Sequence, residues 1–357
     1  MSLRALFLMP FAWLYGLIMW FRNKLFDWGI LTEKEHYIPI ISIGNLSMGG
    51  TGKTPMVESL IRLFQEEYKL ATLSRGYGRK TKGFVIADEN ATAKIIGDES
   101  MQYVKKFPKA VVAVSENRNR GVENLLKRVP DLELIILDDA FQHRFIKAGL
   151  SILLTDFYHL YSDDYVFPAG SLREFRRGAR RADIIIVTKT PIVLSPITRR
   201  RITAELKLQK RQLLLFSKIS YDKLLPYFDN NKKRLKKHYS HIVLFSGIAN
   251  NYPLQDHLQQ FCTDLTTLSF SDHHEYKPKD IDKILEAYNN VFSQNKILVT
   301  TEKDAMRLKS CELTSVFEGI PFYYIPIRAI FHNGDGELLS KASLSFLSNF
   351  KHSAKEI

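Results

Sequence analysis

Cysteine is scarce in this sequence, and histidine forms no cluster at zinc-binding spacing. Cys262 and Cys311 are the only cysteines among 357 residues, and no CxxC pair occurs. These absences argue against a disulfide framework and a structural zinc site, and they fit a reducing cytosolic setting. Low-complexity tracts and internal repeats are also absent, while 45% of the residues are hydrophobic. We therefore expect a folded protein with a buried core and two domains.

Acidic residues are few relative to basic ones. The chain has 38 Asp and Glu against 51 Lys and Arg, which gives a formal net charge of +13. The field of such a surface attracts anions. Nucleic acid, an acidic bilayer surface and a phosphorylated substrate all fit this charge, which does not choose among them.

An uncharged, apolar run occupies residues 5–21, ALFLMPFAWLYGLIMWF. As a helix it would rise about 26 Å, which is marginal for spanning a bilayer. No signal-peptide cleavage site follows it. Its aromatic residues favour a bilayer interface and it has no polar face, which predicts a helix embedded in lipid or in a deep protein groove. The alternative is a buried core helix that is broken at Pro10.

Strand-like runs alternate with amphipathic segments from residue 38 onward. The first series lies at residues 38–44, 70–74, 110–115, 132–139, 151–156, 183–189 and 213–218. This alternation is typical of a parallel sheet wound with helices. A polar, basic stretch then precedes a shorter series of the same kind: HIVLFSG, TTLSF, KILVTT and PFYYIPI.

Residues 41–55 read ISIGNLSMGGTGKTP, with three glycines between an apolar strand and a helix-like segment. Glycines at these positions let backbone amides close around phosphate at the N-terminus of a helix. In that geometry Lys53 neutralises charge on the β- and γ-phosphates, and the Thr54 hydroxyl coordinates Mg²⁺. The usual first glycine of the motif is Ser47 here. The sequence thus predicts a loop that binds a nucleoside triphosphate with Mg²⁺ through Ser47, Met48, Gly49, Gly50, Thr51, Gly52, Lys53 and Thr54.

Together these patterns predict an α/β protein of the P-loop NTPase class with a doubly wound, mostly parallel sheet. The expected order is a membrane-associated helix in residues 1–30, a P-loop ATP-binding domain in residues 31–220, a basic linker in residues 221–240 and a smaller α/β domain in residues 241–357. The smaller domain is expected to contribute to the active site.

Two acidic residues, Asp138 and Asp139, end the apolar run LELIILDD. Such residues are expected where a Walker B carboxylate holds Mg²⁺ at the C-terminal edge of a strand. A simple turn or helix cap is the alternative, and the upstream P-loop favours the metal.

Three further motifs have both a structural and a functional interpretation. Asp98 in GDES precedes a helical pattern, and its spacing favours a helix N-cap over a general base for a substrate hydroxyl. SFSDHHEY places Asp272, His273 and His274 after a strand, where a carboxylate can orient an imidazole for proton transfer or the histidines can be structural. PAGSLREFRRGARR is either a solvated basic face or a site for phosphate or anionic headgroups.

TTEKDAMRL follows a strand and places Lys303 and Asp304 at the start of a helix. Helix capping would explain the aspartate. The sequence assigns this motif no further role.

In their order along the chain, these motifs resemble one family, the tetraacyldisaccharide 4'-kinases of lipid A biosynthesis. The set runs from about residue 41 to residue 307 and comprises ISIGNLSMGGTGKTP, GDES, LDDAFQHR, FPAGSLRE, FSGIAN, FSDHHEY and TTEKDAMRL. The resemblance implies transfer of the γ-phosphate of ATP to the 4'-hydroxyl of a lipid A disaccharide 1-phosphate. It also implies a location on the cytoplasmic face of the bacterial inner membrane.

The resemblance implies roles for individual residues. Asp98 corresponds to the family's proposed base, supported by Asp272 and His273, and Arg118 corresponds to an arginine near the transferred phosphate, although Arg120 is close enough to take that place. Residues 47–54 correspond to the ATP loop. The implied metal ligands are Thr54, Asp138, Asp139 and Glu174. The implied substrate-binding residues are Gln142, His143 and Arg173. Ala140 and Ser100 depart from the residues that the family commonly has.

Two other classes of protein share part of this pattern. A P-loop ATPase or GTPase switch would have the same loop and acidic pair, but no NKxD-type guanine motif occurs in the expected place. A nucleic-acid-dependent ATPase is suggested only by the basic charge and leaves the apolar N-terminus unexplained. The lipid-kinase hypothesis instead expects ATP, the acidic lipid and the membrane surface as partners, and no nucleic acid.

Overall fold

The computed structural model describes residues 3–228, 235–272, 274–309 and 312–353. Its larger sheet has nine strands, and all neighbours are parallel except at the two edges, where β14 and β3 run antiparallel to β8 and β4. The strands in spatial order are β14 (Ile327–Phe331), β8 (Leu213–Tyr221), β7 (Ile184–Thr188), β6 (Leu150–Asp156), β1 (Ile40–Asn45), β5 (Leu134–Asp138), β2 (Leu70–Ser74), β4 (Val111–Val114) and β3 (Val85–Ile86).

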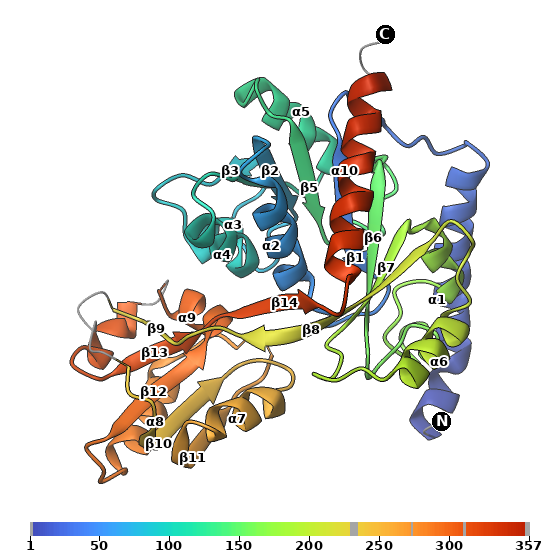
Figure 1. Cartoon of the computed structure of the whole chain (residues 1–357). Coiled ribbons are helices and arrows are strands. Elements are labelled where there is room, and N and C mark those ends of the chain that lie inside the picture. Colours follow the sequence, from blue (N-terminus) through green and yellow to red (C-terminus); the bar gives the residue numbers. More distant parts are fainter. Residues whose placement is uncertain (1–2, 229–234, 273, 310–311, 354–357) are drawn as a thin grey trace.

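Helices cover both faces of this sheet (Figure 1). Alternate residues of each strand point to opposite faces, so each face has its own apolar cluster. One face carries α2 (Lys53–Phe64), α4 (Asp98–Lys106) and α10 (Asp335–Ser353). The other carries α5 (Arg118–Arg128) and α6 (Pro196–Leu206). The short α3 (Ala93–Ile96) precedes α4. The predicted doubly wound, mostly parallel sheet is confirmed.

A smaller sheet of five strands forms the second domain, at the lower left of Figure 1. In spatial order its strands are β11 (Cys262–Ser269), β10 (Tyr239–Ser246), β12 (Lys296–Thr301), β13 (Phe322–Ile325) and β9 (Leu225–Pro226). Its helices are α7 (Tyr252–Gln259), α8 (Pro278–Asn289) and α9 (Glu302–Lys309), followed by a 3₁₀ turn at Glu312–Phe317.

The boundaries of the second domain differ from those expected. The pattern of PFYYIPI predicts one strand, but Pro326 separates β13 in the small sheet from β14 in the large one. After β14, α10 packs Leu339 and Leu347 into the core of the first domain. The last part of residues 241–357 therefore returns to the large sheet. Residues 229–234 of the expected linker lie outside the described residues, and β9 within it belongs to the small sheet.

The two domains meet where α4 faces α9. Lys106 of α4 forms ion pairs with Glu302 at 2.5 Å and Glu58 at 2.8 Å, and both carboxylates are almost wholly buried. Burial raises the pKa of Glu302 to about 7, and Lys106 opposes that rise. A buried charge is tolerated only when it is paired. Lys106 therefore joins α2 to α9, because the buried carboxylates of Glu58 and Glu302 would repel each other without it.

The N-terminal helix α1 (Leu3–Asp27) runs through Pro10 without a break. Only a narrow stripe of it is buried, at Ala12 and Phe26, and Gly16 lies so close to Phe175 that an added Cβ would come within 2.5 Å of the ring. The exposed apolar side chains of α1 are Leu6, Phe7, Phe11, Trp13, Leu14, Leu17, Ile18, Trp20 and Phe21. A core helix broken at Pro10 is therefore not what forms. Among the described residues, no helix has the length and apolarity needed to cross a membrane.

Candidate active site

The P-loop lies between β1 and α2, as predicted. Gly49 has φ of +119° and Gly52 has φ of +80°, in the region that only glycine occupies without strain. A Cβ at Gly49 or Gly50 would meet no atom within 4 Å, so the space over the loop is open. The backbone amides at the start of α2 face the same edge of the sheet, where they can bind phosphate.

Side chains of neighbouring strands hold the loop in place. Asn45, at the end of β1, donates from Nδ2 to Oγ1 of Thr51 at 2.9 Å. Thr188, at the end of β7, donates from Oγ1 to the carbonyl oxygen of Thr51 at 2.8 Å. Nζ of Lys53 lies 3.4 Å from Oδ1 of Asn45 and 3.7 Å from Oδ1 of Asp139. The loop is thus fixed before any ligand binds.

Asp138 ends β5 next to the P-loop strand and is 1% exposed. Its Oδ2 accepts a hydrogen bond from the Tyr103 hydroxyl at 3.0 Å, while its Oδ1 is buried without a partner. Burial raises the pKa of Asp138 to about 7, with further contributions from Glu99 and Asp139 and an opposing one from Lys53. A buried oxygen without a partner is unfavourable, and a bound cation or a proton would stabilise it.

Asp139 has different surroundings from its neighbour. Its φ of +49° turns the chain away from the strand, and its two carboxylate oxygens lie 2.9 and 3.1 Å from Nη1 of Arg173. The same Nη1 lies 3.3 Å from Oε1 of Gln142. The structure therefore brings together three of the residues that the resemblance assigned to substrate and metal.

Glu174 is 2% exposed and already has partners for its carboxylate. Arg181 donates to both of its oxygens at 2.8 and 2.9 Å, Asn23 of α1 donates to Oε2 at 2.8 Å, and Nε2 of Gln142 lies 3.3 Å from Oε1. The resemblance implies that Glu174 is a metal ligand. In this structure its carboxylate instead accepts the hydrogen bond from Asn23 and so attaches α1 to the site.

Arg118 is buried at the start of α5, with its Nη1 close to the carbonyl oxygens of Ser115 and Glu116. Burial lowers its pKa to about 10, and the charges of Asp138 and Asp139 oppose that shift. Arg120 contributes its backbone N–H to the N-cap of the same helix. Of the two arginines left open by the sequence, Arg118 is the one whose charge acts on the acidic pair.

His143 lies in the same electropositive region. Burial lowers its pKa to about 4, and Arg118 and Arg22 add to the effect. The imidazole is therefore neutral at physiological pH and can accept or donate a hydrogen bond without carrying charge.

Asp98 is the first residue of α4, but it does not cap that helix. The N-cap is Gly97, and the Asp98 carboxylate instead accepts a hydrogen bond from Nε of Arg307 at 2.7 Å. Lys303, one turn earlier on α9, lies 2.9 Å from Glu99. Both contacts cross from the first domain to the second, so the candidate base lies at the domain interface.

Arg307 is itself held firmly. Its Nη1 donates to Oδ1 of Asp304 at 3.0 Å and lies 3.2 Å from the carbonyl oxygen of Gly247, and its side chain is 8% exposed. Asp304, fully buried, also accepts hydrogen bonds from the Thr301 hydroxyl and the Gly247 amide. The sequence suggested only a cap for Asp304. No local pattern in TTEKDAMRL reveals that Arg307 contacts Asp98 across 209 positions.

Asp272 acts on the same side of the interface. Burial lowers the pKa of the Lys303 amine, but Glu99 and, to a smaller extent, Asp272 raise it above its ordinary value. His273 lies outside the described residues, so its predicted role is not tested. Its neighbour His274 bonds to Asp280 at 2.9 Å. Arg307 and Lys303 of α9 thus contact Asp98 and Glu99, and the charge of Asp272 acts on the same Lys303.

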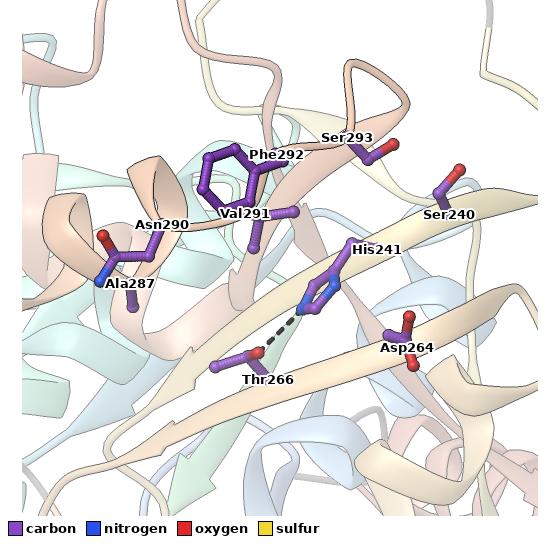
Figure 2. Close-up of a pocket in the computed structure, with 9 residues that line it drawn as sticks. All are labelled: Ser240, His241, Asp264, Thr266, Ala287, Asn290, Val291, Phe292 and Ser293. Atoms are coloured by element: carbon purple, nitrogen blue, oxygen red, sulfur yellow. Dashed lines mark hydrogen bonds between the residues drawn. The ribbon is translucent and has the colours of Figure 1, made fainter.

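A hollow of about 520 Å³ in the second domain is separate from this site (Figure 2). It is lined by Ser240, His241, Asp264, Thr266, Ala287, Asn290, Val291, Phe292 and Ser293. His241, in the first half of β10, bonds at 2.8 Å to Thr266 in the middle of β11, whereas the motifs of the site follow the carboxyl ends of those strands. This hollow therefore lies away from the motifs of the site.

Known proteins resemble this chain over most of its length. Residues 4–343 match the model of the family described as tetraacyldisaccharide-1-P 4'-kinase. A tetraacyldisaccharide 4'-kinase of Bacteroides thetaiotaomicron is 45% identical over 90% of this chain and 87% of its own length. One from Flavobacterium johnsoniae is 44% identical over 93% and 94%. The crystal structure of apo-form LpxK from Aquifex aeolicus in complex with ATP matches with a TM-score of 0.72 and 28% identity, covering 97% of this chain and 100% of that one.

The environment of Asp138 predicts a pH-dependent gain in stability for Asp138→Asn. Because the folded-state pKa is raised to about 7, the folded carboxylate is ionised at pH 8 and unfavourably buried, whereas at pH 5 it is protonated. The variant should therefore exceed the wild type in free energy of unfolding at pH 8, and this advantage should shrink by roughly 2 kcal/mol at pH 5. Urea denaturation of the ligand-free protein measures both values.

The control for this prediction is Asp131→Asn. Asp131 is exposed and its pKa is lowered by a hydrogen bond from Lys69, so its replacement should bring no gain at pH 8. Equal destabilisation by Asp138→Asn at both pH values would contradict the account of Asp138.

Proposed function

Since the chain belongs to the tetraacyldisaccharide-1-P 4'-kinase family and is an ATP-dependent lipid A 4'-kinase, we propose that residues of both domains carry out its phosphoryl transfer. The γ-phosphate of ATP passes to the 4'-hydroxyl of a tetraacyldisaccharide 1-phosphate. The observation that supports the proposed site most directly is the buried, unpartnered Oδ1 of Asp138 beside the P-loop.

The residues around Asp138 fit Mg²⁺. Oδ1 of Asp138 offers a carboxylate oxygen, and Thr54, the second residue of α2, offers a hydroxyl. No group of three or more His, Cys, Asp or Glu side chains suited to a metal occurs within the described residues, but phosphate oxygens and water complete the coordination of Mg²⁺ in P-loop enzymes. When bound, Mg²⁺ would neutralise charge on the phosphates.

Asp139 and Glu174 have a weaker claim as metal ligands. Arg173 forms an ion pair with the Asp139 carboxylate, and Arg181 forms one with the Glu174 carboxylate. Each could bind a metal only by exchanging its arginine, so the proposal rests on Thr54 and Asp138.

The phosphate side of the reaction relies on fixed positive charge. Phosphoryl transfer requires alignment and charge neutralisation more than covalent help from the protein. Lys53 extends along the P-loop, and Arg118 lies buried beside the acidic pair.

The acceptor side relies on Asp98. A sugar hydroxyl is too weak an acid to ionise at neutral pH, so a base must accept its proton as the new bond to phosphorus forms. Arg307 fixes the position of the Asp98 carboxylate, and Asp272 with His273 would support it from the second domain. Gln142, His143 and Arg173, which lie near the acidic pair, would contact the acceptor sugar or its phosphate.

The exposed apolar face of α1 suggests where the acceptor comes from. Phe7 is 79% exposed and Phe11 58%, although leaving such side chains in water is unfavourable. An amphipathic or apolar helix combined with a basic surface gives firmer attachment to an anionic bilayer than either alone. We assign α1 to the cytoplasmic face of the inner membrane, where the acidic lipid substrate would be collected.

The activity assay uses labelled ATP and tetraacyldisaccharide 1-phosphate. The wild type should phosphorylate the lipid, while Lys53→Ala and Asp98→Ala should reduce kcat by roughly 100-fold or more, because one removes phosphate neutralisation and the other the proton acceptor. Hydrolysis of ATP without any lipid product from the wild type would instead favour a P-loop switch.

Arg307 provides a more specific test of how Asp98 is positioned. Arg307→Gln should lower kcat roughly 10- to 100-fold with little change in KM for ATP, because Asp98 loses the contact that fixes it. Arg307→Lys should recover part of the rate. Arg328→Gln is the matched control, since Arg328 pairs with Asp222 in a partly exposed surface position. A rise in KM for ATP with kcat unchanged would contradict a role through Asp98.

The membrane assignment is tested by fractionation. Deleting residues 1–21 should move the protein from the membrane pellet to the soluble fraction. The double variant Phe7→Ser/Phe11→Ser, which leaves the stripe packed against Phe175 intact, should do so in part. Unchanged sedimentation of both variants with membranes would refute the assignment.

A further inference from the structure

Three aliphatic side chains project into solvent from the turn between β7 and α6. Ile192 is 77% exposed, Val193 83% and Ile197 79%, more than any other Leu, Ile, Val or Met side chain among the described residues. We refer to residues 191–197 as the aliphatic turn. Three such side chains within six positions form a local apolar projection, which a water-soluble surface ordinarily avoids.

The turn is rigidly mounted. Ser195 caps α6 by accepting a hydrogen bond from the backbone amide of Thr198. One turn into the helix, Arg199 lies over the ring of Phe216 and bonds at 2.5 Å to Asp335, which is 1% exposed. These contacts tie α6 to Phe216 of β8 and to the start of α10. The apolar side chains are therefore displayed on a fixed scaffold.

The aliphatic turn lies at the same edge of the sheet as the ATP site. It follows β7, whose last residue, Thr188, donates a hydrogen bond to the P-loop carbonyl of Thr51. Ile192 is four positions after Thr188, a reach of at most about 14 Å. The start of the turn therefore lies close to the P-loop.

The turn is continuous with the surface formed by α1. Leu194 of the turn and Tyr15 of α1 pack against one apolar cluster, which also contains Ile202 and Leu206 of α6. Figure 1 shows α6 beside the N-terminal half of α1. While Leu194 and Tyr15 face inward, Ile192 and Val193 of the turn and Phe7 and Phe11 of α1 are exposed.

Basic side chains accompany the turn. Arg200 and Arg201 follow Ile197 by three and four positions, so they lie on the same face of α6, and both are exposed. Arg199, in contrast, is engaged by Asp335. Apolar side chains beside exposed arginines match the interface of an anionic bilayer. A second copy of this chain, with its net charge of +13, would be repelled at the same place.

We propose that Ile192, Val193 and Ile197 insert into the interface of an anionic bilayer as a second attachment point beside α1. This inference deepens the proposed membrane assignment and rests on it. Attachment at two points fixes orientation as well as binding. It directs the edge that carries the P-loop toward the headgroup layer, where the sugar of a lipid substrate lies.

The test measures binding of the full-length protein to vesicles of phosphatidylcholine with phosphatidylglycerol by flotation. The triple variant Ile192→Ser/Val193→Ser/Ile197→Ser should lower the partition coefficient roughly tenfold or more. Arg200→Ser/Arg201→Ser should lower it by about fivefold per arginine at low salt, and not on phosphatidylcholine alone. The matched control is Phe292→Ser, since Phe292 is 98% exposed but lies in the second domain; its binding should equal that of the wild type.

The Phe7→Ser/Phe11→Ser variant separates the two proposals. If it weakens binding while the triple variant does not, the aliphatic turn has no membrane role and α1 alone attaches the chain. If neither weakens binding, the membrane assignment fails as well. If the triple variant changes only the oligomeric state in solution, the turn is a contact between proteins and the proposal is overturned.

A label provides a measurement that does not depend on loss of binding. An environment-sensitive dye at Val193→Cys, in a chain with Cys262→Ser and Cys311→Ser, should shift its emission to the blue on vesicle addition and be quenched by brominated lipid. The same dye at Phe292→Cys should show neither change. Equal behaviour of the two positions would contradict insertion of the turn.

Discussion

A carboxylate buried with one oxygen unpaired is the constraint on which the active site depends. Burial raises the pKa of Asp138 to about 7 and leaves Oδ1 without a partner, an arrangement that is unfavourable unless a cation or proton compensates it. The nearby compensating groups come from three helices: Lys53 from α2, Tyr103 from α4 and Arg118 from α5. The Asp138 carboxylate therefore interacts with side chains of three helices at one edge of the sheet.

Helix α4 connects Asp138 with the second domain. Its Tyr103 faces Asp138, while its Asp98 and Lys106 face Arg307 and Glu302 of α9. The donor half of the site is built on the large sheet and the candidate base lies at the contact between domains. In the proposed mechanism the candidate base therefore depends on the second domain, because Arg307 of α9 holds the Asp98 carboxylate.

The sequence allowed the donor half to be predicted but not the interface. The P-loop at residues 47–54 comes shortly after β1, and Asp138 ends β5. Both strands are recognisable from local apolar runs, so the loop, the aspartate and the edge of the sheet on which they lie could be inferred. Arg307 contacts Asp98 across 209 positions, and no local pattern encodes that pair. Likewise Pro326 divides an apparently single strand between two sheets, and spacing suggested a cap at Asp98 where Gly97 holds that position.

The central claim is that Oδ1 of Asp138 is a ligand of the metal that accompanies ATP. Anomalous scattering from crystals of the full chain grown with Mn²⁺ and a non-hydrolysable ATP analogue tests it most directly. The account predicts a peak within about 2.3 Å of both Oδ1 of Asp138 and Oγ1 of Thr54. A peak bound to the phosphates and Thr54, with Asp138 still bonded only to Tyr103, would contradict it.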